Sequence, residues 1–195
     1  MLEVAHDHRL GHQPGRASIL VFANHARMGV YADALALDPA APDVTATESP
    51  GRVKYGASTN LEQALAPDLG VFARAGWNDG RTQTWAFTEI DSTASFGLTR
   101  KGTRWSRPDD VLGCAVVVNG LSSAHRDYLA AGGLGFIIGD GRLSYSPETI
   151  IESYYSLQLK KGFAVTSDLQ LVFNPADNRD RGPVAIGTVR VHAEF

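Results

Sequence analysis

The sequence has little cysteine, no long apolar run and no excess of basic charge. Cys114 is the only cysteine among the 195 residues, so a disulfide framework is excluded. No stretch approaches the ~18 consecutive apolar residues of a membrane-spanning helix. The net charge is −3, which offers no basic field for nucleic acid. The first residues show no charged segment followed by an apolar core, so no signal peptide is visible. Disulfide scaffolds, helical membrane proteins and nucleic-acid binders are thereby excluded.

The composition is nevertheless that of a chain that folds. Hydrophobic residues make up 44% of the sequence and charged residues 20%, which is too apolar for intrinsic disorder. A membrane β-barrel stays open, because its strands alternate apolar and polar residues and never build a peak of hydropathy.

Alternation over residues 188–195 marks the last segment, 184–195, as a strand. Apolar side chains fall on one face, and ionisable side chains such as Arg190 and His192 fall on the other. The segment 163–174 repeats the pattern and carries Phe163 and Phe173 near its ends. At ~3.3 Å per residue and ~45° tilt, these two aromatics are roughly 23 Å apart in height, close to the ~25 Å apolar band of an outer-membrane barrel.

The same reasoning predicts nine strands and two short helices. The strands are expected at Leu2–Arg9, Ala17–Met28, Val53–Leu61, Leu69–Trp77, Thr93–Lys101, Val111–Asn119, Thr149–Leu159, Phe163–Asn174 and Val184–Phe195. Helical turns are expected at Tyr31–Leu37 and Ser122–Ala131. The connections alternate between short and long, as they do in barrels with short periplasmic turns and long external loops.

An odd number of strands indicates part of a barrel. Bacterial single-chain barrels have an even number of strands, and an open sheet edge is not tolerated in lipid. Residues 1–195 are therefore expected to be the C-terminal portion of a single barrel domain, with N-terminal strands and a signal peptide absent. The expected fold class is all-β, an antiparallel transmembrane β-barrel.

Two groups contain residue types that occur in catalytic or metal sites. Ser122, His125 and Asp127 are the residue types of a hydrolase triad, but one helical turn cannot align them and no Gly-x-Ser-x-Gly elbow is present. His6 and His8 fall short of the three or four ligands that a metal site needs. The sequence therefore predicts neither a catalytic triad nor a bound metal.

Several segments together resemble the carbohydrate-selective porin (OprB) family. They are Asn78–Gly80, Ala86–Asp91, Trp105–Asp110, Ser123–Leu129, Gly132–Gly141, Glu152–Tyr155 and Val191–Phe195. The resemblance implies a sixteen-stranded outer-membrane barrel, of which these strands are the last nine, with passive diffusion of mono- and small oligosaccharides such as glucose. It implies no enzyme activity and no cofactor. The expected partners are carbohydrates, the lipid bilayer and the outer-membrane assembly machinery. The resemblance implies that this machinery binds the terminal Phe195.

Sugars are neutral polyols, so a sugar channel needs hydrogen-bonding groups of both kinds and aromatic faces along its lumen. The residues expected to line the pore or contact sugar are Arg74, Glu89, Asp91, Glu152, Tyr154, Gln158, Asp168, Gln170 and Arg190. Glu89 and Asp91 are placed at the channel mouth. As a glycosidase pair they would instead need a shared cleft with roughly 5–9 Å between the carboxyl groups. The alternatives are a general non-selective porin, an outer-membrane enzyme and a soluble sugar-binding β-protein.

Overall fold

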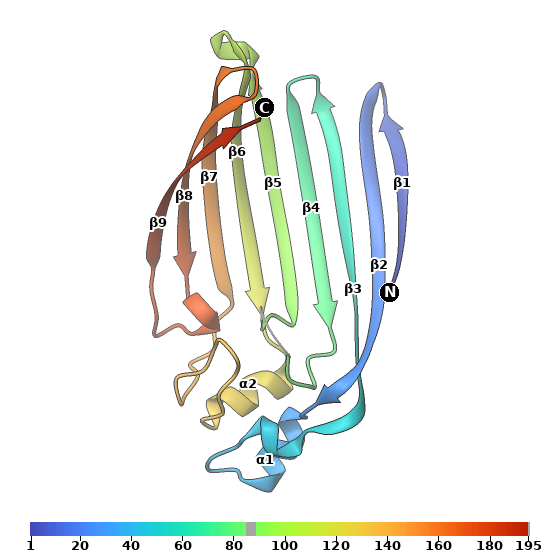
Figure 1. The fold of residues 1–195 in the computed structure, drawn as a ribbon, viewed down its shortest axis with the longest axis vertical. Helices are drawn as coiled ribbons and strands as arrows, with labels where there is room; N and C mark the ends of the chain where they lie inside the picture. Colours follow the sequence, from blue (N-terminus) through green and yellow to red (C-terminus); the bar gives the residue numbers. More distant parts are fainter. Residues whose placement is uncertain (85–88, 195) are drawn as a thin grey trace.

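The computed structural model describes residues 1–84 and 89–194 and shows one sheet of nine antiparallel strands (Figure 1). Each strand pairs with its neighbours in the sequence, so the order is β1 to β9 without a crossover. The strands are β1 (Leu2–Leu10), β2 (Gln13–Met28), β3 (Ser49–Ala66), β4 (Leu69–Asn78), β5 (Ser92–Gly102), β6 (Arg107–Gly120), β7 (Glu148–Lys160), β8 (Phe163–Phe173) and β9 (Val184–Ala193). Within the described residues no ladder joins β1 to β9, and the sheet is open.

Short turns and long connections lie at opposite ends of the sheet, as predicted. The short turns join β1 to β2, β3 to β4, β5 to β6 and β7 to β8 (Figure 1). The long connections contain the helices α1 (Tyr31–Leu37) and α2 (Ser123–Ala130) and the 3₁₀ turns η1 (Val44–Thr47) and η3 (Pro175–Asp177); η2 (Thr103–Trp105) lies in the turn before β6. No helix in the described part of the chain is long and apolar enough to cross a membrane.

The register assigns each side chain to one of two faces, because directly paired residues point to the same side of a sheet. Glu152 pairs with Gln170, and Tyr154 pairs with Asp168. The pairs that alternate with these lie on the opposite face, and each contains at least one apolar residue, as in the pair Ile151–Leu171. The ladder between β8 and β9 continues both rows, with Thr166–Arg190 on the polar face and Val165–Val191 on the apolar face. The expected alternation is thus present in the paired sheet.

The buried core lies among the long connections and not on the sheet. It consists of Tyr31, Ala34, Val44, Leu121, Tyr128, Leu129 and Ile138. Many large apolar side chains on the strands are exposed, for example Leu169 at 52% and Val189 at 72%. The residues of this cluster thus pack where the long connections meet, and none of them lies on a strand.

The boundaries of several strands differ from the prediction. β3 spans Ser49–Ala66 and β2 begins at Gln13, so both are longer than their alternating segments. Backbone hydrogen bonds continue past the alternating segment, because a ladder does not depend on which side chains it carries. Two sequence predictions fall outside the described residues. They are the role of Phe195 in assembly and the part of the family resemblance carried by residues 86–88.

Candidate functional site

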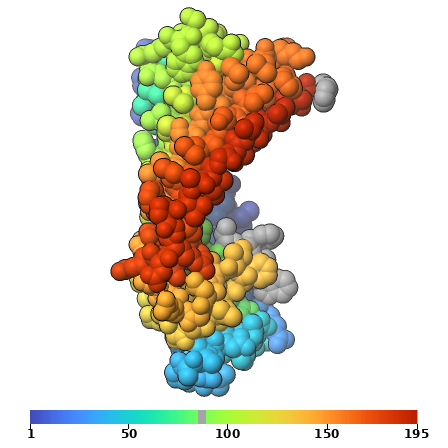
Figure 2. Space-filling view, turned by 90° about the vertical axis from the view of Figure 1, so that its left-hand side faces the viewer, coloured from blue at the N-terminus to red at the C-terminus, as the bar shows by residue number. Residues whose placement is uncertain are grey.

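The polar face of the sheet is the hollowed face. The side view in Figure 2 shows the curvature of the molecule and a hollow on one side. Two cavities lie on this hollowed side. Most of the residues that line them belong to the polar rows defined by the register, so the hollowed side is the polar face.

The first hollow lies over β6 to β9 and has a volume of about 620 Å³. Five of the predicted site residues line it: Glu152, Tyr154, Asp168, Gln170 and Arg190. Gln170 Nε2 donates a hydrogen bond of 3.0 Å to Glu152 Oε2. The hollow therefore presents both charge signs, an amide and an aromatic ring to whatever occupies it.

The second hollow lies over β1 to β5 and has a volume of about 790 Å³. Arg74 is here: its Nε donates to Asn60 Oδ1 at 2.9 Å, and its Nη2 lies 3.8 Å from Glu62 Oε1. The lining also includes four charged residues that were not predicted from the sequence, namely Asp7, Arg9, Arg16 and Glu62. One of these residues could have been predicted. Glu62 continues the polar row of Asn60, but it lies just past the predicted end of the strand.

Gln158 lies on the polar row of β7, as predicted, but its side chain has a different role. A register shift follows it in β7, and its Nε2 donates to Lys160 O at 2.6 Å and to Phe163 O at 3.3 Å. The side chain therefore ties the turn between β7 and β8, and it does not border either hollow.

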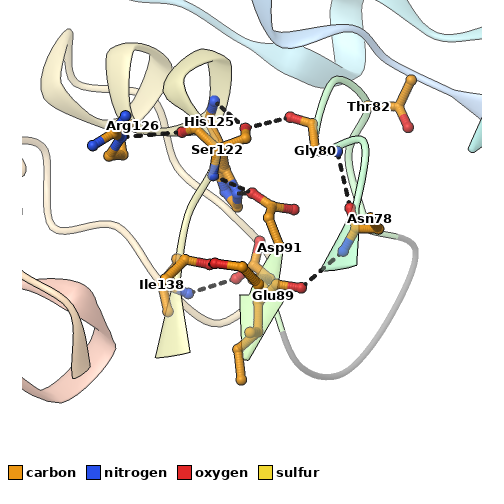
Figure 3. A network of polar contacts seen from close by, with 12 residues as sticks. Asn78, Gly80, Thr82, Glu89, Asp91, Ser122, His125, Arg126 and Ile138 are labelled. Atoms are coloured by element: carbon orange, nitrogen blue, oxygen red, sulfur yellow. Dashed lines mark hydrogen bonds and ion pairs between the residues drawn. The ribbon is translucent and has the colours of Figure 1, made fainter. Parts of the chain in front are cut away.

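Glu89 anchors a loop (Figure 3). Its carboxylate is 5% exposed and accepts three backbone N–H groups, from Phe136 at 2.8 Å, Ile137 at 2.7 Å and Ile138 at 2.8 Å. A Cβ at residue 135 would lie 2.1 Å from Glu89 Oε1, so the wrapped loop needs the glycine that stands there. The expectation that Glu89 lines the channel mouth is corrected, because its acceptors are occupied by the chain itself.

Asp91 holds the start of α2 in the same network. It is 3% exposed and accepts hydrogen bonds from Ser122 N at 2.9 Å and His125 Nδ1 at 3.0 Å. Burial raises the pKa of Asp91, but these hydrogen bonds and the charges of His125 and Lys54 outweigh it, so the pKa lies below its usual range. Asp91 is thus an internal anchor and does not rim the mouth as expected.

The triad residue types are also used for structure. Ser122 caps α2 by accepting from His125 N at 3.1 Å, and its Oγ donates to Gly80 O at 2.6 Å. His125 is fully buried against Tyr31, with the ring centroids 4.3 Å apart. The carboxylate beside His125 is therefore Asp91 and not Asp127.

These connections fold toward the hollowed face. Lys54 lies on the polar row of β3 and is 8% exposed, and its Nζ donates to Thr82 O at 2.9 Å. The segment between β4 and β5 is thereby attached to the inner side of β3. The described residues contain no group of three or more His, Cys, Asp or Glu side chains that could hold a metal ion.

Asp177, in the connection between β8 and β9, gives the fold a predicted pH dependence. The side chain is buried, and burial together with the charge of Glu148 raises its pKa to about 6, although Glu148 N donates to its Oδ1. In the folded protein the pKa of Asp177 exceeds the unfolded value of ~3.9, so protonation of Asp177 favours the folded state. This contribution to the unfolding free energy is fully present below pH ~4 and is lost as the pH rises through about 6.

The unfolding free energy of the wild type should therefore fall by about 2 kcal/mol between pH 4 and pH 7 because of Asp177. Asp177→Asn cannot titrate and should lack this fall. Denaturant titrations of both proteins at the two pH values measure the difference. An identical change in both proteins would show that Asp177 does not titrate as described.

The comparisons with known proteins agree with this geometry. The whole chain, residues 1–195, matches the family described as "Carbohydrate-selective porin, OprB family", a family of channels and not of enzymes. The structure superposes on the high-pH structure of Pseudomonas putida OprB with a TM-score of 0.81 and 17% sequence identity, over 99% of this chain and 47% of that one. A search of curated proteins gave no match. The chain thus spans about half the length of its structural neighbour, and it belongs to the carbohydrate-selective porin, OprB family.

Proposed function

We propose that this sheet forms part of the wall of a bacterial outer-membrane channel through which carbohydrates diffuse without energy input. The observation that carries the proposal is the pairing of a polar, hollowed face with an apolar, exposed face on the same strands. The family and the fold of the structural neighbour support the same function.

The hollows offer what a passing sugar requires. Arg190 and Arg74 supply fixed guanidinium donors, and Glu152 and Asp168 supply acceptors, so the wall can exchange hydrogen bonds with hydroxyl groups in place of water. The opposite charges leave little net field, so neutral solutes are not disfavoured relative to ions. Each contact should be worth about 1 kcal/mol, because a permeant must also leave.

Sugar uptake by cells tests the function. Cells that produce the protein should take up glucose at micromolar concentration several times faster than cells from which its gene is deleted, because outer-membrane diffusion limits uptake there. A matched non-sugar solute of similar size should show a smaller difference. Equal acceleration of both solutes would indicate a general porin, and no acceleration of either would contradict a channel function.

Arg74→Ala should lower the discrimination between glucose and the matched solute while the protein still folds. Arg74 is largely exposed in the hollow, where it contacts Asn60, Glu62 and the ring of Phe72, so truncation costs little stability. Swelling of liposomes made from outer membranes of the producing cells measures the ratio of the two rates. An unchanged ratio in Arg74→Ala, Glu152→Ala and Asp168→Ala alike would place the selectivity outside these hollows.

A further inference from the structure

Three aromatic side chains on the hollowed face each stand directly opposite a glycine of the adjacent strand. The register pairs Phe22 with Gly56, Phe72 with Gly97, and Tyr154 with Gly113. The three pairs lie on β2–β3, β4–β5 and β6–β7, so they are distributed around the wall.

In each pair the ring lies across the neighbouring strand. A Cβ built on Gly56 would be 2.7 Å from Phe22 Cε1, one on Gly97 would be 2.4 Å from Phe72 Cε1, and one on Gly113 would be 2.2 Å from Tyr154 Cε1. Only glycine leaves this space free. The wall then covers one side of each ring, and all three side chains are half-buried.

Polar groups surround two of these rings. Tyr154 borders the hollow that contains Glu152, Asp168 and Arg190. Phe72 borders the other hollow, where the guanidinium carbon of Arg74 lies 4.9 Å from its ring centroid. Arg74 thus already stacks on Phe72, whereas no aromatic or cationic partner is found for the Tyr154 ring within the described part of the chain.

We infer that the three aromatic–glycine pairs are stacking plates for the apolar face of a pyranose ring, with Tyr154 the principal one. A pyranose carries axial C–H groups on its face and hydroxyl groups around its edge. An aromatic plate bordered by carboxylates and a guanidinium matches both, since the ring receives the C–H face and the charged groups receive the hydroxyls. This inference rests on the proposed sugar-channel function and specifies the form of sugar that the wall selects.

Saturation-transfer NMR on the 195-residue chain in detergent micelles tests the inference, because it detects weak binding and reports which ligand protons touch the protein. The probes are methyl β-glucopyranoside and sorbitol, a linear polyol without a rigid apolar face. In the wild type, the axial H1, H3 and H5 protons of the glucoside should receive the most saturation, and sorbitol should receive at least threefold less.

Tyr154→Leu keeps an apolar side chain over Gly113 but removes the ring, and the combined Phe22→Leu and Phe72→Leu variant does the same for the other plates. Each should reduce saturation of H1, H3 and H5 at least twofold, with Tyr154→Leu the larger loss. Phe96→Leu, on the apolar face, is the matched control and should change nothing. Equal saturation of all glucoside protons, unchanged in every variant, would contradict stacking on these rings. It would remain compatible with sugar binding elsewhere on the wall. No saturation of any solute by the wild type would contradict the sugar-channel function as well.

Discussion

Glu89→Ala is expected to make trypsin cleave after Arg142 about tenfold faster, or more, than in the wild-type protein. The Glu89 carboxylate binds the N–H groups of residues 136–138, and Arg142 is exposed in the same connection. A hydrogen bond to a charged group is worth roughly 1.5–3 kcal/mol, and about 1.4 kcal/mol already changes an equilibrium tenfold. Cleavage follows the open population when the loop opens and closes quickly.

Two variants control this experiment. Glu62→Ala removes a carboxylate that lines a hollow and accepts no backbone N–H from residues 1–84 or 89–194, so cleavage after Arg142 should keep the wild-type rate. Glu89→Gln keeps one acceptor oxygen and should give an intermediate rate. Equal rates in Glu89→Ala and the wild type would show that the loop is held by other contacts.

Leu169→Lys is expected to destabilise the protein in lipid vesicles by about 2–4 kcal/mol, whereas Gln170→Lys should cost little. The two residues are neighbours in the middle of β8, but Leu169 is on the apolar face and Gln170 borders a polar hollow. A lysine near the bilayer midplane loses its hydration, and a lysine in an aqueous lumen does not.

Denaturant titration of both variants in the same vesicles measures this difference. The comparison is internally matched, because the new residue, the strand and the depth are nearly the same. Equal loss of unfolding free energy in the two variants would mean that the two faces do not meet different solvents.

Period-two alternation predicted all nine strands and the face of most site residues. Alternation in the middle of β8 and the last part of β9 assigned Asp168, Gln170 and Arg190 to one wall without any knowledge of their partners. The alternation fails at the start of β9, where the apolar Ile186 pairs with Gln170 on the same row. The α1 boundaries were also predicted, and α2 lies within the predicted segment.

Contacts between distant segments could not be predicted in the same way. Glu89 meets residues 136–138 across 47 to 49 positions, and nothing in local alternation records that meeting. The aromatic–glycine pairs require the register between strands, which alternation leaves undefined. Gln158 lies on the predicted row, but alternation could not show that its amide would bind the carbonyl groups of the following turn.

The native cysteine provides the most direct test of the two-faced sheet. Cys114 is exposed and lies on the apolar row of β6, paired with Ser153 and beside Ala115, which belongs to the polar row with Glu152. A nitroxide on Cys114, in protein reconstituted in lipid vesicles, should be relaxed strongly by oxygen and weakly by a water-soluble nickel chelate. With Cys114→Ser, a nitroxide introduced by Ala115→Cys should show the reverse. Equal access of the nickel chelate to both positions would contradict a wall with lipid on one side and water on the other.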